Sequence, residues 1–161
     1  MYIRPAQMDD APAIWSIIAP VIRAGETYAL DRDMTEADAL AYWLGNDREA
    51  FVAEENGEII GTYYLRANQA GGGDHICNCG YMTSAAATGR GVARAMCEHS
   101  LEHAKRSGYR GMQFNFVVST NARAIGLWES FGFLIVGRLA QAFRHPTLGY
   151  VDALVMSRQL L

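Results

Sequence analysis

A strand, a turn of small residues and a long amphipathic helix follow one another in the middle of this 161-residue chain, and this succession limits its possible folds most. The expected strand runs from Ile76 to Thr83 and the expected helix from Gly91 to Ser107. Between them stand alanines and glycines, which keep no ligand away from the main-chain N–H groups at the helix start. These groups have no partner within the helix and lie at the positive end of its dipole. The sequence therefore predicts an anion site at this turn.

The other expected elements alternate between strands and helices, which is typical of one α/β domain over residues 1–161. Apolar residues recur at helical spacing from Ile14 to Ile22, Asn56-Gly57 indicates a hairpin turn, and Gly108 ends the long helix. Further helices are expected to begin near Thr35 and Asn121. Further strands are expected at Tyr2 to Arg4, Ala50 to Glu54, Ile59 to Leu65, Met112 to Val118, Phe133 to Gly137 and Val151 to Ser157, with a loop at Phe143 to Tyr150.

Composition argues against several classes of protein. The net charge of −3 gives no electrostatic reason for binding nucleic acid or a membrane surface. No apolar stretch approaches the roughly 20 residues that a membrane-spanning helix needs. Three cysteines do not make a disulfide framework, which favours a reducing cytoplasm. Cys77 and Cys79 have no second Cys-x-Cys pair beside them, so no metal site is expected.

The glycine turn fits neither of two common nucleotide-binding motifs. Arg94 stands where a dinucleotide-binding turn has its third glycine, and the strand Met112 to Val118 does not end in the acidic residue that binds ribose. No Gly-Lys-Ser/Thr occurs, which excludes a Walker loop. Taken alone, the turn is equally compatible with anion binding and with a purely structural helix start.

Two motifs together resemble the GCN5-related N-acetyltransferase (GNAT) family. The family's cofactor motif, Gln/Arg-x-x-Gly-x-Gly/Ala at the start of its long helix, falls on Thr88 to Ala93. Its second motif, an asparagine after the fifth strand and a helix followed by Gly-Phe, falls on Asn121, Trp128 and Gly132-Phe133. The resemblance implies a mixed, mostly antiparallel central sheet that is splayed between its fourth and fifth strands, with helices on both faces. It also implies that acetyl-coenzyme A binds in the splay.

The resemblance assigns main-chain groups to this cofactor. The pyrophosphate would lie on the N–H groups from Gly89 to Ala93, and the pantetheine arm would pair with the backbone of Met82 and Thr83. Asn121 would touch coenzyme A. The cofactor-binding residues implied in this way are Met82, Thr83, Thr88, Gly89, Arg90, Gly91, Val92, Ala93, Asn121 and Trp128.

Two positions depart from the family pattern. Thr88 replaces the usual glutamine or arginine, and Arg90 is the residue expected to supply the missing positive charge. Trp128 stands where many relatives have a tyrosine that protonates the departing thiolate. An indole N–H donates a hydrogen bond but is not a practical acid. A thiol with a pKa near that of cysteine, about 8.5, leaves as a thiolate without one.

Asn78 and Asn115 are the expected catalytic residues. They stand on the two strands that flank the predicted splay, where asparagine is uncommon, and the segment Ile76 to Thr83 has no carboxylate to act as a base. Their surroundings resemble a fungal branch of the family that acetylates azetidine-2-carboxylate and related proline analogues. This implies that both amides hold the substrate and align its amine, with positioning and a water relay in place of a base. The alternative is that they satisfy irregularities of the sheet.

Loops are expected to select the substrate, since they carry specificity on a rigid scaffold. The expected substrate-binding residues are Glu26, Tyr28 and His145, together with Asn78 and Asn115. The predicted function is direct transfer of an acetyl group from acetyl-coenzyme A to the amine of a small molecule, an amino acid or an analogue, and a homodimer is the expected assembly. Acetylation of a protein N-terminus or lysine, and a coenzyme A-binding module without turnover, stay open as alternatives.

Overall fold

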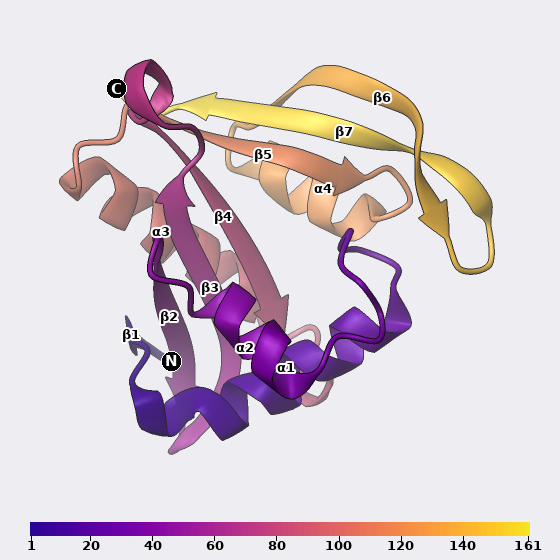
Figure 1. The fold of residues 1–161 in the computed structure, drawn as a ribbon. Helices are drawn as coiled ribbons and strands as arrows, with labels where there is room; N and C mark the ends of the chain where they lie inside the picture. Colours follow the sequence, from indigo (N-terminus) through magenta and orange to yellow (C-terminus); the bar gives the residue numbers. More distant parts are fainter.

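The computed structural model describes residues 1–161, which form one seven-stranded sheet with four α-helices (Figure 1). The strand order is β1-β2-β3-β4-β5-β7-β6, and every neighbouring pair is antiparallel except β4 and β5. The strands are β1 (Tyr2–Pro5), β2 (Arg48–Glu55), β3 (Glu58–Ala67), β4 (Ile76–Thr83), β5 (Gly111–Val118), β6 (Leu134–His145) and β7 (Gly149–Gln159). The helices are α1 (Ala11–Ala24), α2 (Glu36–Trp43), α3 (Val92–Arg106) and α4 (Ala122–Ser130). The predicted mixed α/β sheet is confirmed.

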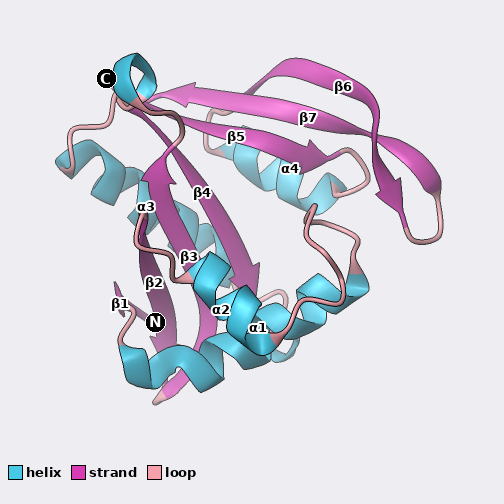
Figure 2. Ribbon diagram, viewed as in Figure 1, coloured by secondary structure: helices cyan, strands magenta, loops and turns pink.

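Helices cover both faces of this sheet (Figure 2). Successive residues of a strand point to opposite faces, so a strand that is apolar on both sides needs a helix layer on each. Tyr64 of β3 packs in a cluster with Ile18 of α1 and Trp43 of α2. Its neighbour Tyr63 packs on the other face with Met96 of α3, in the larger core cluster. No helix of the fold is both long and apolar enough to cross a membrane.

The sheet is splayed between β4 and β5, as expected. These strands pair only at their beginning, through Ile76 with Gly111 and Cys77 with Met112. Further along β5, the register with β7 shifts between Phe114 and Val117. Such a bulge bends a strand and leaves its extra residue unpaired. The facing edges of β4 and β5 therefore separate beyond the first two pairs.

The prediction of a loop at Phe143 to Tyr150 is wrong. The ladder between β6 and β7 continues through Phe143–Val151 and Arg144–Tyr150 to His145–Gly149, so only residues 146–148 form the turn. β6 is a largely exposed edge strand with a register shift between Leu139 and Phe143, and Gln141 has a positive φ of 50°. This interruption removes the regular alternation of apolar and polar residues by which a strand is recognised in a sequence.

Candidate active site

Two cavities meet at the splay, one on each face of the sheet. The first, of about 440 Å³, lies on the face covered by α1 and α2, below the loop that follows α1. The second, of about 570 Å³, lies between the start of α3 and helix α4. The residues that line both are Tyr81, Thr83, Asn121, Ala124 and Trp128. A ligand that enters from the α3 side can therefore reach the opposite face between β4 and β5.

The turn before α3 presents free main-chain donors to the second cavity. Gly89 and Gly91 have φ values of 81° and 78°, which glycine adopts without strain. The N–H groups of Gly89, Gly91, Val92 and Ala93 donate no hydrogen bond within the protein. All four residues line the cavity, as does Thr88, whose N–H is directed back to Ala85 O at 3.4 Å. The predicted anion site thus has its donors available.

The arginines that line the second cavity are not the one expected from the sequence, which was Arg90. Arg90 forms an ion pair with Glu55 of β2, its N–H donates to Ala87 O, and it does not line the cavity. Arg94 and Arg123, which were not expected at the cofactor site, do line it. They stand in the first turns of α3 and α4, so an arginine in the opening turn of each helix was the available signal.

The main chain of β4 offers alternate residues to the splay. Asn68 N donates to Ile76 O and Ser84 N to Ile60 O, which directs the even-numbered residues of β4 toward β3. The backbone groups of Cys79, Tyr81 and Thr83 face the splay instead. Of the two residues expected to pair with the pantetheine arm, Thr83 has the required orientation. Met82 is paired with Thr62 of β3, and only its side chain lines the first cavity.

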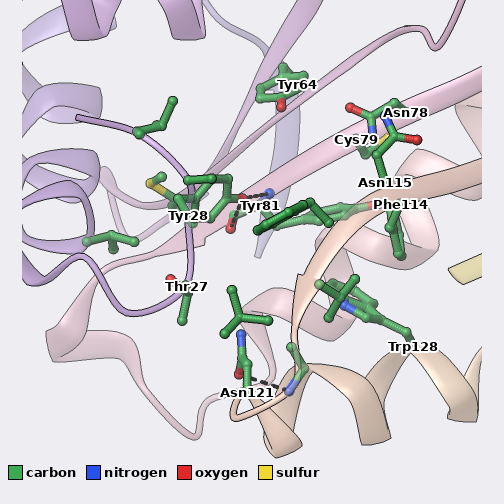
Figure 3. A pocket seen from close by; sticks show the side chains of 18 of the residues that line it. Thr27, Tyr28, Tyr64, Asn78, Cys79, Tyr81, Phe114, Asn115, Asn121 and Trp128 are labelled. Atoms are coloured by element: carbon green, nitrogen blue, oxygen red, sulfur yellow. Dashed lines mark hydrogen bonds between the residues drawn. The ribbon is translucent and has the colours of Figure 1, made fainter. Parts of the chain in front are cut away.

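Tyr28 is hydrogen-bonded to this open edge. Its hydroxyl donates to Tyr81 O at 2.9 Å and accepts from Tyr81 N at 2.8 Å, so it takes the place of a neighbouring strand (Figure 3). Burial raises the pKa of Tyr28, which keeps the hydroxyl protonated for both bonds. Tyr28 lines the first cavity, whereas Glu26, in the same loop, lines neither.

His145, the third loop residue expected to bind substrate, lies at the β6–β7 turn and lines neither cavity. Its Nδ1 accepts hydrogen bonds from the N–H groups of Thr147 and Leu148, both at 3.2 Å. These bonds stabilise the short turn that the sequence did not predict.

Asn78 and Asn115 come together at the closed end of the splay, where both line the first cavity (Figure 3). Asn78 Nδ2 donates to Gln113 O at 2.9 Å, bridging β4 to β5 just beyond their last pair. Asn115 Nδ2 donates to Asn68 Oδ1 at 2.6 Å, and its Oδ1 accepts from Gln113 Nε2 at 3.0 Å. The oxygen of Asn78 has no hydrogen-bond partner. The side chain of Asn78 thus joins the two strands and still leaves an acceptor for an N–H donor.

Aromatic side chains form the wall between the cavities. Trp128 is 8% exposed, and its ring lies 5.0 Å from the ring centres of both Tyr81 and Phe114. Its indole N–H has no hydrogen-bond partner. No carboxylate or histidine lines the first cavity, and burial raises the pKa of the one thiol there, Cys79, which keeps it un-ionised and unreactive. No group of three His, Cys, Asp or Glu side chains is arranged to hold a metal ion.

Comparison with known proteins agrees with this architecture. The model of the acetyltransferase (GNAT) family matches residues 13–133. The N-acetyltransferase aca1 of Schizosaccharomyces pombe is similar, with 29% identity over 153 residues, 83% of this chain and 72% of that protein.

Solved structures are similar over nearly the whole chain. A GCN5-related N-acetyltransferase from Kribbella flavida is 40% identical, with 98% of this chain and 96% of that one covered and a TM-score of 0.94. YncA, a putative acetyltransferase from Salmonella typhimurium solved with its cofactor acetyl-CoA, is 25% identical, with 100% and 94% covered and a TM-score of 0.87. The family match over most of the chain, the splayed sheet and the glycine turn that opens α3 lead to one conclusion: this chain belongs to the acetyltransferase (GNAT) family.

Proposed function

We propose that this protein transfers an acetyl group from acetyl-coenzyme A to the amine of a small molecule, an amino acid or an analogue, within a ternary complex. The observation that carries the proposal is the meeting of two unlike cavities at the splay. One is lined by free main-chain donors and two arginines, and the other by amide and aromatic side chains. Acetyl-coenzyme A supplies the activated acetyl group. Cytoplasmic location and a homodimer stay predictions from the sequence.

The second cavity has the chemistry to hold the phosphates of the donor. Free N–H groups at Gly91, Val92 and Ala93 bind anions at the positive end of α3, and Arg94 and Arg123 add charge-assisted donors. An extended amide-containing arm can pair with the backbone of Thr83 as an added strand would. Asn121 and Trp128 flank its path, since they line both cavities.

The first cavity has the chemistry to align an amine. Asn78 Oδ1 is free to accept a hydrogen bond from an amine N–H, which would direct the nitrogen lone pair toward the splay. No carboxylate in this cavity competes to hold the amine in its charged form. Since an amide side chain cannot take up a proton, the proton released during transfer leaves through water.

Glycine substitutions at the two ends of α3 test the cofactor site. Gly91→Glu places a carboxylate among the proposed phosphate donors, so we expect acetyl-coenzyme A affinity to fall by about 100-fold or more, measured by calorimetry. Gly108→Glu is the matched control: Gly108 also has a positive φ, 88°, and open space where a side chain would begin, but it lies past the other end of the helix. Equal affinities in the two variants would disprove the site.

Turnover is tested by thiol release from acetyl-coenzyme A with a panel of amines. We expect release with small amino acids or their analogues. Binding of acetyl-coenzyme A without release on any amine would instead indicate a binding module. Activity confined to peptides would indicate a protein acetyltransferase.

A further inference from the structure

One charged side chain lines the first cavity, and it is a cation. Arg66 of β3 stands in register with Asn78 of β4, and the two belong to a hydrogen-bonded antiparallel pair. Paired residues of this kind direct their side chains to the same face, with Cα atoms about 5.5 Å apart. The side chains of Arg66 and Asn78 therefore leave β3 and β4 on the same face, and both residues line the first cavity.

The positive charge of Arg66 is only partly neutralised. Its Nη2 lies 3.6 Å from Asp47 Oδ2, but the same carboxylate accepts closer hydrogen bonds from Arg48, at 2.8 Å from Nε and 3.4 Å from Nη2. The hydrogen bond from Arg48 holds the pKa of Asp47 below its usual value, so Asp47 is ionised. Two guanidinium groups share one carboxylate, which leaves the cluster Asp47–Arg48–Arg66 with a net charge of +1.

The cluster also lies directly behind the cavity wall. The guanidinium of Arg48 stands 4.8 Å and 4.7 Å from the ring centres of Tyr42 and Tyr64, and both rings line the first cavity. The side chain of Arg48 is 7% exposed, and its Nη1 is buried without a hydrogen-bond partner. Arg48 is therefore poorly hydrated and holds Asp47, whereas Arg66, at 35% exposure, is accessible from the cavity, so the excess positive charge favours an anion at this end of it.

We infer that Arg66, supported by the Asp47–Arg48 pair, binds a carboxylate of the amine substrate. The inference deepens the proposed function and rests on it. The acceptor is then a small amino acid or analogue whose amine meets Asn78 while its carboxylate meets Arg66. Polyamines and other purely cationic amines are disfavoured, because no acidic group of the cavity balances their charge. The same positive charge also lowers the pKa of a bound amine, which favours its neutral, nucleophilic form.

The test compares amino acids with their primary amides, which keep the amine and lose the carboxylate. The measured quantity is kcat/KM for the acid divided by kcat/KM for the amide. Comparison of this ratio between enzyme variants cancels the intrinsic reactivity of each amine. Arg66→Gln is expected to lower the ratio by about 10- to 100-fold, mainly through a higher KM for the acid, because a charge-assisted hydrogen bond is lost. Arg144→Gln is the control: this arginine is exposed on β6, lines neither cavity and should leave the ratio unchanged.

A second substitution keeps the test decisive if Arg66→Gln fails to fold. Asp47→Asn removes the one carboxylate of the cluster, so the ratio should rise instead of fall. An unchanged ratio in both variants, with acetyl-coenzyme A affinity intact, would overturn the carboxylate site and leave the acetyltransferase proposal standing. Absence of thiol release with every acid and amide would overturn the acetyltransferase proposal and the carboxylate site with it.

Discussion

At the scale of single residues, polar side chains at the splay both hold the sheet together and face the first cavity. Asn78 bridges β4 and β5 through its nitrogen and leaves its oxygen free, so it supports the sheet and faces the cavity at once. Tyr28 satisfies both the donor and the acceptor of the Tyr81 backbone, which would otherwise face the cavity unpaired. A buried main-chain group without a hydrogen-bond partner lowers stability. The Tyr28 hydroxyl pairs with two such groups, so it should contribute measurably to the free energy of unfolding.

Tyr28→Phe tests this contribution to stability. The substitution keeps the ring and removes both hydrogen bonds to Tyr81, so we expect the free energy of unfolding to fall by about 1–3 kcal/mol in denaturant titrations. Tyr150→Phe is the control, since Tyr150 is 65% exposed, and it should change stability by less than about 0.5 kcal/mol. Similar small losses in the two variants would mean that water replaces the Tyr28 hydroxyl without penalty.

The sequence could give the type of these residues but not all of their partners. Asn78 and Asn115 were expected at the splay, and the structure brings them together there. Arg66, Arg94 and Arg123 were missed, because whether an arginine faces a cavity or forms an ion pair depends on neighbours distant in the chain. Arg90 shows the opposite error: its place in the motif favoured a phosphate contact, but Glu55, 35 residues away, pairs with it.

At the scale of secondary structure, each helix start near the cavities has a distinct way of satisfying its N–H groups. Helix α3 begins at Gly91 with no side-chain cap, so its donors stay free. Helix α4 begins at Asn121, whose Oδ1 accepts from Ala124 N at 3.3 Å. The Nδ2 group of Asn121 has no partner, and the residue lines both cavities. The cap and the cavity therefore use different atoms of one side chain.

Asn121→Asp separates these two roles. Aspartate caps a helix about as well as asparagine, so stability in the absence of ligand should change little. The new carboxylate replaces an N–H donor on the proposed path of the cofactor phosphates, so we expect acetyl-coenzyme A affinity to fall by about tenfold, measured by calorimetry. Asn121→Ala should lose about 1 kcal/mol of stability instead. A fall in stability with unchanged affinity in Asn121→Asp would assign the residue to the helix alone.

Regular elements were predictable where their periodicity is clear. The strand β4 was expected at the residues where it occurs, and the long helix before Gly108 within one residue at each end. The β6–β7 hairpin was underestimated, since β6 is exposed on both faces for most of its length and carries no period-two pattern.

At the scale of the whole molecule, the first cavity places no carboxylate or histidine near the proposed position of the substrate amine. Burial raises the pKa of Tyr28, Tyr64 and Tyr81, which line the same cavity. Groups with raised pKa values keep their protons through neutral pH, so these tyrosines cannot act as bases there. The substrate amine itself is left as the group whose titration controls the rate.

The pH profile should follow the substrate. We expect kcat/KM to rise about tenfold per pH unit up to the pKa of the amine and then level off, because only the neutral amine attacks. Steady-state rates with two substrates of different amine pKa provide the check, and the plateau should begin at lower pH for the less basic amine. An inflection at one fixed pH for both substrates would reveal a base in the protein.

Only two residue pairs join the β4 and β5 backbones, so the sheet is open where the cofactor is proposed to bind. In the proposed complex, the cofactor supplies hydrogen bonds to the part of these edges that Tyr28 leaves free, and its binding energy adds to the free energy of folding. The half-life of the chain against proteolysis should then track the concentration of acetyl donor around it. A depleted donor pool would shorten that half-life, and the amount of enzyme would follow the metabolic state of the cell.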